Sequence, residues 1–300
     1  MPIKILLFGN TGQVGTELTH ALHQLGQLKP CGREEADLED KDRLKAVICD
    51  YRPDIIVNAA AYTAVDRAEL EPDKAARVNA EAVALLAEEA RRLDAWLVHY
   101  STDYVFDGTK DKPYNETDQP NPLGIYGETK LQGEESIRRS GCKYLIFRTS
   151  WVYGAHGSNF IKTILRLARE RETLNVVVDQ HGTPTSAALI AEISAKAIPA
   201  TLDETMRRGT YHLTPSGDTT WHELAQRVVS RAQQLGMPRL LKPEQVQPIP
   251  TMDYPTLAVR PMNSRLDSSL LSMTLGIALP DWQSEVDCFV DFLVREEARQ

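Results

Sequence analysis

Three glycines, spaced three residues apart, follow the first apolar run of the chain. Residues 3–8 predict a buried strand, and apolar residues recur behind the glycines at helical spacing. A strand that enters a helix through a glycine turn predicts a phosphate-binding loop, because glycine permits a tight turn and close backbone approach to a pyrophosphate. The free N–H groups of the first helical turn would face the phosphates. The candidate cofactor-binding residues here are Gly9, Gly12, Gln13, Val14 and Gly15, and the alternative is a glycine turn without a ligand.

The rest of the first half alternates short apolar runs with amphipathic stretches. Strands are expected at 54–58, 96–100 and 144–147, and an alanine-rich helix is expected at 75–93. This alternation predicts an α/β fold with a Rossmann-type doubly wound parallel sheet. Beyond residue 154 the pattern changes to a helix at 160–170, short strands at 175–178 and 211–213, a proline-rich region, and a final helix from Trp282.

The change in pattern predicts two domains of unequal size. We expect a nucleotide-binding domain at residues 1–155, with segments returning around 173–225. We expect a smaller, mainly C-terminal α/β substrate domain at residues 156–300. A chain of 300 residues is long enough for two such cores.

Composition and charge exclude several classes of function. The net charge of −8 argues against a surface for nucleic acid or an anionic membrane, and no apolar run reaches bilayer length. The cysteines form no Cys-x-x-Cys pair, which argues against a zinc site or a disulfide framework. We therefore expect a reduced, cytoplasmic protein that binds neither nucleic acid nor membrane.

Three polar residues near the middle of the chain form a candidate reacting group. Thr102 ends a predicted strand, where open α/β sheets bind their ligands. Tyr126 and Lys130 lie four residues apart, and hence on the same face of a helix. We expect Tyr126 to exchange a proton with a substrate oxygen and Thr102 to donate to the same oxygen. Lys130 would hold a ribose and lower the pKa of Tyr126. Taken singly, each of the three also suits an ordinary structural position.

The end of the weak second strand bears on the choice of cofactor. An acidic residue there would bind a ribose 2′-hydroxyl and favour NAD, whereas an arginine accommodates a 2′-phosphate. Gly32-Arg33 stands at this point, which favours NADPH, with NADH as the alternative. Arg33 as a solvated loop charge is an equally weighted interpretation.

The glycine loop, Thr102 and the Tyr126…Lys130 pair together resemble the extended short-chain dehydrogenase/reductase superfamily. Within it the chain resembles the dTDP-4-dehydrorhamnose reductase family. The segments that carry this closer resemblance span most of the chain and are 58–66, 101–106, 148–154, 179–185 and 260–266. Each segment is weakly specific, and the combination is specific.

The resemblance implies NADPH-dependent reduction of the C4 ketone of dTDP-4-dehydro-β-L-rhamnose, the last step of dTDP-L-rhamnose synthesis. It implies that Asp103 and Trp151 contact the sugar, together with Thr102, and that residues 260–263 close over the diphosphate. By analogy with such chains, Asp37 and Leu38 border the adenine. The stretch Ala61, Tyr62 and Thr63 matches a cofactor-lining segment.

The sequence departs from the family at one point. Some members dimerise through a magnesium ion held by glutamates; Glu17 matches one such position, but Ala188 stands at the partner position. Loss of a carboxylate weakens a site for a hard cation. We therefore predict no structural magnesium, and a monomer or weak dimer.

Two other functions remain open at this point. A nucleotide-sugar epimerase or dehydratase would keep NAD bound, but the acidic pair usual after the threonine of dehydratases is absent, because Tyr104 follows Asp103. A non-catalytic subunit resembling the beta subunit of methionine adenosyltransferase would bind NADP without turnover. The intact Thr102, Tyr126 and Lys130 set argues against the second alternative.

Overall fold

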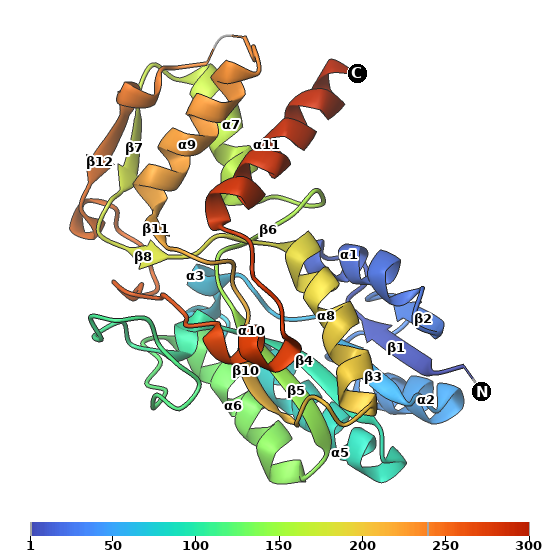
Figure 1. Cartoon of the computed structure of the whole chain (residues 1–300). Helices are drawn as coiled ribbons and strands as arrows, with labels where there is room; N and C mark the ends of the chain where they lie inside the picture. Colours follow the sequence, from blue (N-terminus) through green and yellow to red (C-terminus); the bar gives the residue numbers. More distant parts are fainter. Residues whose placement is uncertain (1, 239, 300) are drawn as a thin grey trace.

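A six-stranded parallel sheet organises the first half of the chain. The computed structural model describes residues 2–238 and 240–299, and the strand order across the sheet is β10-β5-β4-β3-β1-β2 (Figure 1). The strands of this sheet are β1 (Lys4–Phe8), β2 (Gln27–Cys31), β3 (Ile55–Asn58), β4 (Trp96–Thr102), β5 (Lys143–Thr149) and β10 (Gly209–His212). Each neighbouring pair runs parallel, which confirms the predicted α/β class and doubly wound sheet.

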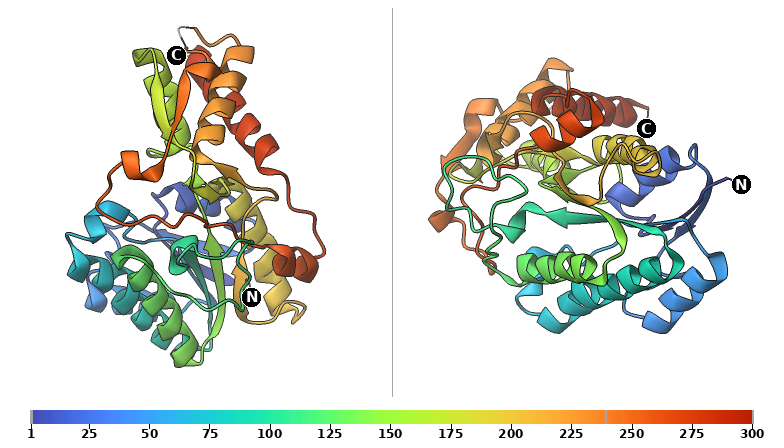
Figure 2. Two further views of the ribbon diagram at one scale, coloured as in Figure 1. Left: turned by 90° about the vertical axis from the view of Figure 1, so that its left-hand side faces the viewer. Right: turned by 60° about the horizontal axis from the view of Figure 1, so that its bottom comes forward.

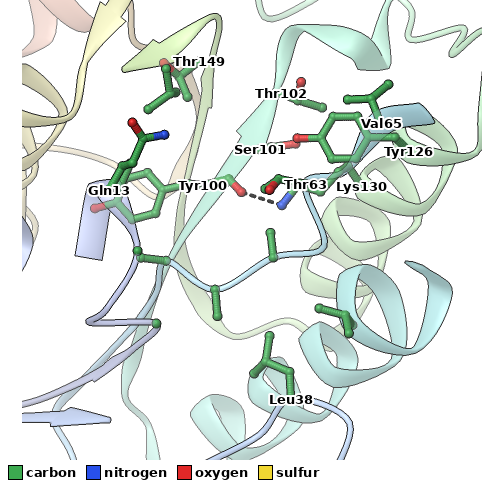
Figure 3. A pocket seen from close by; sticks show the side chains of 18 of the residues that line it. Gln13, Leu38, Thr63, Val65, Tyr100, Ser101, Thr102, Tyr126, Lys130 and Thr149 are labelled. Atoms are coloured by element: carbon green, nitrogen blue, oxygen red, sulfur yellow. Dashed lines mark hydrogen bonds between the residues drawn. The ribbon is translucent and has the colours of Figure 1, made fainter. Parts of the chain in front are cut away.

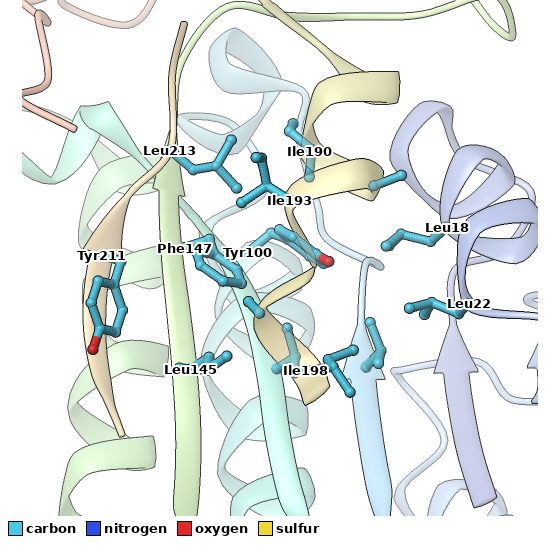
Figure 4. Packing of buried hydrophobic residues seen from close by; sticks show 14 of the residues in the cluster. Leu18, Leu22, Tyr100, Leu145, Phe147, Ile190, Ile193, Ile198, Tyr211 and Leu213 are labelled. Atoms are coloured by element: carbon cyan, nitrogen blue, oxygen red, sulfur yellow. The ribbon is translucent and has the colours of Figure 1, made fainter. Parts of the chain in front are cut away.

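Both faces of the sheet are covered by helices (Figures 1 and 2). The helices that join the strands are α1 (Gln13–Leu22), α2 (Lys41–Tyr51), α3 (Val65–Ala68), α4 (Pro72–Ala76), α5 (Ala82–Leu93), α6 (Ile125–Ser140) and α8 (Ala187–Leu202). Because side chains alternate across a strand, Ile5 and Leu7 pack toward α1 and α8, whereas Leu6 and Phe8 pack toward α2 and α5. Figure 4 shows the first of these two cores, with Leu18 of α1 and Ile193 of α8 facing the strands.

A third core lies beyond the carboxyl ends of the strands (Figure 1). It is built from α7 (Phe160–Glu170), β7 (Leu174–Val177), α9 (Trp221–Gln234), β12 (Val246–Ile249) and α11 (Trp282–Ala298). Short strand pairs connect it to the sheet: β6 (Val152–Tyr153) with β9 (Thr185–Ser186), and β8 (His181–Gly182) with β11 (Thr219–Thr220). Short 3₁₀ turns lie at Asp103–Val105, Pro243–Gln245 and Thr251–Asp253.

The chain passes more than once between the main sheet and the third core. Although β7 belongs to the third core, α8 and β10 return to the sheet, as does α10 (Ser269–Leu275) through Leu271. The predicted strand at 211–213 thus forms the edge of the main sheet as β10. The expected domain boundary at residue 155 stays a prediction. Within residues 2–238 and 240–299, no helix combines the length and the apolar character needed to cross a membrane.

The predicted alanine-rich helix is interrupted by one π-helical turn. The turn spans Arg77–Glu81, between α4 and α5. It turns the side chain of Asn79 toward Tyr62, whose backbone N–H donates to Asn79 Oδ1 at 2.9 Å and whose carbonyl accepts from Asn79 Nδ2 at 3.0 Å. Single π turns inside α-helices are frequent at functional sites. This one fixes the loop that follows β3.

Candidate active site

The glycine loop packs against its own helix as the spacing predicts. Gly9 has a φ of +82°, and its N–H donates to the carbonyl of Cys31 at 2.9 Å. A Cβ at Gly15 would lie 1.9 Å from the carbonyl oxygen of Gly9, so only glycine allows α1 to approach the turn this closely. Gly12 is exposed and caps α1, where the first N–H groups of the helix are available to an anion.

The loop opens into a cavity of about 640 Å³ at the carboxyl ends of the strands. Most of the predicted site residues line it: Gly9, Gly12, Gln13, Val14, Arg33, Asp37, Leu38, Ala61, Thr63, Thr102, Asp103, Tyr126, Lys130 and Trp151. Two predicted residues, Gly15 and Tyr62, do not line the cavity. Gly15 packs against the backbone of Gly9, and the Tyr62 hydroxyl donates to Glu71 Oε2 at 2.8 Å. The backbone of Tyr62, held by Asn79, positions its neighbours Ala61 and Thr63 instead.

Arg33 and the two residues expected beside the adenine, Asp37 and Leu38, line this cavity. Leu38 is buried against the second core, and the side chain of Arg33 is 82% exposed. The Arg33 guanidinium lies 3.9 Å from the carboxylate of Asp37, too far for a strong ion pair in solvent. Its charge is therefore available to a ligand in the cavity.

Thr102 and Tyr126 lie side by side over the cavity, as Figure 3 shows. Thr102 is the last residue of β4, and its hydroxyl donates to Asp103 Oδ1 at 2.9 Å while accepting from the N–H of Tyr104 at 3.1 Å. Tyr126 lies in the first turn of α6. The tight fit of this turn depends on Gly127, where a Cβ would lie 2.1 Å from the carbonyl oxygen of Tyr104.

The expected lowering of the Tyr126 pKa is wrong for the protein without ligands. Burial raises the pKa of the Tyr126 phenol well above its ordinary value, and the Thr102 hydroxyl only partly opposes this. The amine of Lys130 donates to the carbonyl of Tyr100 at 2.6 Å (Figure 3) and lies 3.2 Å from His99 Nε2. The physical cause is the cost of a phenolate in a buried site. The Tyr126 phenol is thus protonated at neutral pH.

Burial also shifts the pKa values of two other residues that line the cavity, Lys130 and Asp103. Burial lowers the pKa of Lys130 to about 8, against the influence of Glu134, which raises it. Burial also raises the pKa of the Asp103 carboxyl to about 7, although hydrogen bonds from Ser264 and Thr102 favour its charged form. Strongly shifted groups gathered around one cavity are typical of an active site.

Trp151 is held in an unusual conformation on the opposite wall. Its φ is +47°, in the left-handed region that residues other than glycine rarely adopt. Its ring stacks on Trp221, with the ring centroids 3.6 Å apart. A Cβ at Gly182 would lie 2.5–2.7 Å from three atoms of the Trp151 indole. The indole is thus enclosed between Trp221 and the backbone of Gly182. Trp221 also lines the cavity and was not predicted.

We predict that Gly182→Ala disturbs substrate binding more than turnover. The added methyl group would push the Trp151 indole toward Trp221 and the cavity, so KM for the substrate should rise about tenfold, on the scale of overpacking costs. Steady-state kinetics with saturating cofactor measures this. Gly209→Ala is the matched control, because Gly209 also lies in a strand, its Cβ would meet no atom closer than 3.5 Å, and it does not line the cavity. Equal KM values for both variants would contradict the expectation.

The segment expected near the diphosphate does not line the cavity but lies next to Tyr104, which does. Arg260 Nη2 donates to Asp66 Oδ2 at 2.6 Å, and its guanidinium stacks 5.8 Å from the ring of Tyr104. Asn263 instead donates to the backbone carbonyls of Lys110 and Lys112. Arg260 thus lies beside Tyr104, whereas Asn263 is held by the backbone of residues 110–112.

The two positions at which some family members hold magnesium lie on helices α1 and α8. Glu17 lies on α1, and Ala188 is exposed at the start of α8. Over residues 2–238 and 240–299, no three acidic, histidine or cysteine side chains are grouped to hold a metal ion. The absence of structural magnesium stays a prediction.

The fold and the cavity together define a class of protein. A doubly wound sheet, a glycine loop opening α1, and Thr102, Tyr126 and Lys130 around one cavity are typical of the short-chain dehydrogenases and reductases. Comparison with known proteins narrows the class. A family model described as the RmlD substrate binding domain matches residues 3–294.

Individual relatives agree with this match. The dTDP-4-dehydrorhamnose reductase of Escherichia coli (strain K12) is 48% identical over 94% of this chain and 95% of its own. The dTDP-4-dehydrorhamnose reductase of Burkholderia thailandensis is 46% identical over 97% of this chain and 99% of its own. A crystal structure of the Bacillus anthracis dTDP-4-dehydrorhamnose reductase in complex with NADP has a TM-score of 0.88 at 34% identity, covering 96% of this chain and 99% of that one. The chain belongs to the dTDP-4-dehydrorhamnose reductase family.

Proposed function

We propose that the protein reduces the C4 ketone of dTDP-4-dehydro-β-L-rhamnose with NADPH, giving dTDP-β-L-rhamnose. The observation that carries the proposal is the placement of Thr102 and Tyr126 over a cavity that the glycine loop also enters. Membership of the reductase family supplies the substrate and the reaction. The Bacillus anthracis relative was crystallised with NADP, which supports the same cofactor here.

The residues present fit a dinucleotide. The loop has no side chain at Gly9, Gly12 or Gly15 to block a pyrophosphate, and α1 begins at the loop. The buried hydroxyl of Thr149 lines the cavity and finds no hydrogen-bond partner among the described residues. A buried hydroxyl without a partner is costly unless a ligand or water satisfies it. Lys130 lies where it would hold the ribose of the nicotinamide.

The residues divide the chemistry between them. When bound, the cofactor supplies a hydride to the carbonyl carbon, and the carbonyl oxygen then takes a proton. Tyr126 gives that proton, because burial keeps its phenol protonated. Thr102 would turn its hydroxyl proton from Asp103 Oδ1 to the same oxygen, and this hydrogen bond would strengthen as negative charge develops there. Asp103 and Trp151 would contact the sugar, and Arg260 would contact the diphosphate.

The direct test supplies the keto sugar with NADPH and follows cofactor oxidation together with product. We expect one cofactor oxidised per rhamnose nucleotide formed. Protein that purifies with tightly bound NAD and oxidises no added NADPH would indicate an epimerase or dehydratase. Binding of NADP without turnover, with co-purification of a partner enzyme, would favour a regulatory subunit.

We predict that Arg33→Ala weakens the binding of NADPH but not that of NADH. If the exposed guanidinium binds the 2′-phosphate, its loss should raise KM for NADPH about tenfold and leave KM for NADH unchanged, since a hydrogen bond to a charged group contributes about 1.5–3 kcal/mol. Kinetics with both cofactors tests this. Lys41→Ala is the control, because Lys41 pairs with Glu81 and does not line the cavity. An equal loss for both cofactors would refute the role.

We also propose a cytoplasmic protein that is a monomer or weak dimer and acts on a small nucleotide sugar. The net charge of −8 supports the absence of a nucleic-acid partner.

A further inference from the structure

A buried row of hydrogen-bonding groups connects Lys130 to the backbone of the loop after β3. Lys130 Nζ lies 3.2 Å from His99 Nε2, and His99 Nδ1 lies 3.2 Å from Asn58 Nδ2. The N–H of Ala60 donates to Asn58 Oδ1 at 3.2 Å. Lys130, His99 and Asn58 are at most 2% exposed. The row joins α6, β4 and β3 behind the cavity.

One end of this row has a fixed direction. A backbone N–H can only donate, so the Ala60 N–H makes Asn58 Oδ1 the acceptor and turns the Asn58 amide nitrogen toward His99. That nitrogen is also a donor, so His99 Nδ1 must accept. A neutral imidazole then carries its proton on Nε2. The Nε2–H group points at Lys130.

A charged Lys130 conflicts with this direction. An ammonium group has three donors and no lone pair, so it would meet the Nε2–H of His99 donor to donor. If the Asn58 amide were turned over, its oxygen would face His99 and its NH₂ group would face the N–H of Ala60. Two donors would then meet at Ala60 instead of at Lys130. A neutral amine removes it, because its lone pair accepts from His99 while one hydrogen bonds the carbonyl of Tyr100. An unsatisfied buried donor costs about 1–3 kcal/mol.

The charged and titratable groups around the amine do not reverse this preference. Glu134, one turn further along α6, raises the pKa of Lys130, but its carboxylate is already paired with Arg148 and Arg138. The Tyr126 phenol on the other side stays neutral. Burial, with Lys130 as the lesser cause, lowers the pKa of His99 well below its usual value, so that ring is neutral too.

We propose that Asn58 and His99 are positioning residues that favour Lys130 as a neutral hydrogen-bond acceptor, so that NADPH binding draws a proton onto Lys130 wherever its amine is neutral. The proposal rests on the proposed function only for the identity of the cofactor. Ribose hydroxyls would accept from the amine and favour its charged form. In alkaline solution, the arrival of the cofactor thus completes the cation needed at the active site.

Calorimetry of NADPH binding in two buffers of different ionisation enthalpy measures the protons exchanged. At pH 9, above the pKa of Lys130 near 8, we expect uptake of most of one proton per NADPH, and at pH 6.5 almost none. The isosteric variant Asn58→Asp should abolish the uptake, because a carboxylate accepts from both Ala60 and His99 Nδ1–H and frees Nε2 to accept from the ammonium. Asn175→Asp adds the same charge at an exposed position and should retain it.

A second measurement needs no cofactor. Nitrogen NMR of the His99 ring in the unliganded protein should show a protonated Nε2 and a bare Nδ1, with the two exchanged in Asn58→Asp. A protonated Nδ1 in the natural protein would overturn the proposal, as would NADPH binding at pH 9 without proton uptake. If NADPH fails to bind while the NMR result holds, the proposed cofactor is wrong and the hydrogen-bond direction stands.

Discussion

Tyr126→Phe should lower turnover by about a hundredfold or more, the scale expected when a general acid is lost. In the proposed reaction the phenol gives its proton to the reacting oxygen, and burial keeps it protonated at neutral pH. Phenylalanine fills the same space on α6 and still packs edge-on against Tyr104, whose ring centroid lies 5.9 Å away. NADPH affinity and thermal stability should therefore change little. Turnover is measured with the keto sugar and saturating NADPH.

Tyr211→Phe is the matched control for this experiment. It also removes a tyrosine hydroxyl, one that donates to the backbone carbonyl of Arg207 at 2.9 Å at the edge of the main sheet, and Tyr211 does not line the cavity. Its turnover should stay within a factor of about two of the natural protein. Similar losses in both variants would show that Tyr126 acts through stability rather than proton transfer.

Gly15→Ala should damage both the fold and cofactor binding. The new Cβ would lie 1.9 Å from the carbonyl oxygen of Gly9 and 2.8 Å from Asn10 Cα, so α1 and the loop must move apart. Overpacking of this kind costs about 1–3 kcal/mol, and a displaced loop should lose at least about tenfold in NADPH affinity. Thermal unfolding and fluorescence titration measure the two effects separately.

Gly12→Ala separates packing from ligand contact within the same loop. A Cβ there would approach the carbonyl oxygen of Gly9 only to 3.4 Å, which is an ordinary contact. The unfolding midpoint should therefore stay close to the natural value, while NADPH affinity falls because the methyl group faces the phosphates. Unchanged NADPH affinity in Gly12→Ala would argue that the loop does not bind the pyrophosphate.

Local sequence patterns predicted the strands β1, β3, β4 and β5, because most of their residues are buried. The runs at 54–58 and 144–147 became β3 and β5, and the helix expected at 160–170 has the bounds of α7. The helices α2 and α9 were not predicted. For α9 a signal existed: Thr220 and Glu223 form a capping box at its start.

The candidate site was predictable where each residue type has one clear chemical use. The glycine loop, Thr102, Tyr126 and Lys130 follow from spacing and strand ends. Trp221 was missed because its partner Trp151 lies 70 residues earlier, and no spacing rule links positions that far apart. Asn79 was missed because its role depends on the π turn.

The sequence by itself determined the fold class and predicted the phosphate loop and the candidate reacting residues. Those depend on local backbone geometry and on the chemistry of single side chains. Only the tertiary structure decided their charge states. Burial, which no local pattern measures, leaves Tyr126 a phenol, and the row from Ala60 through His99 sets the direction of the hydrogen bond at Lys130. Protonation depends on desolvation and on neighbours from other strands, and folding alone brings those together.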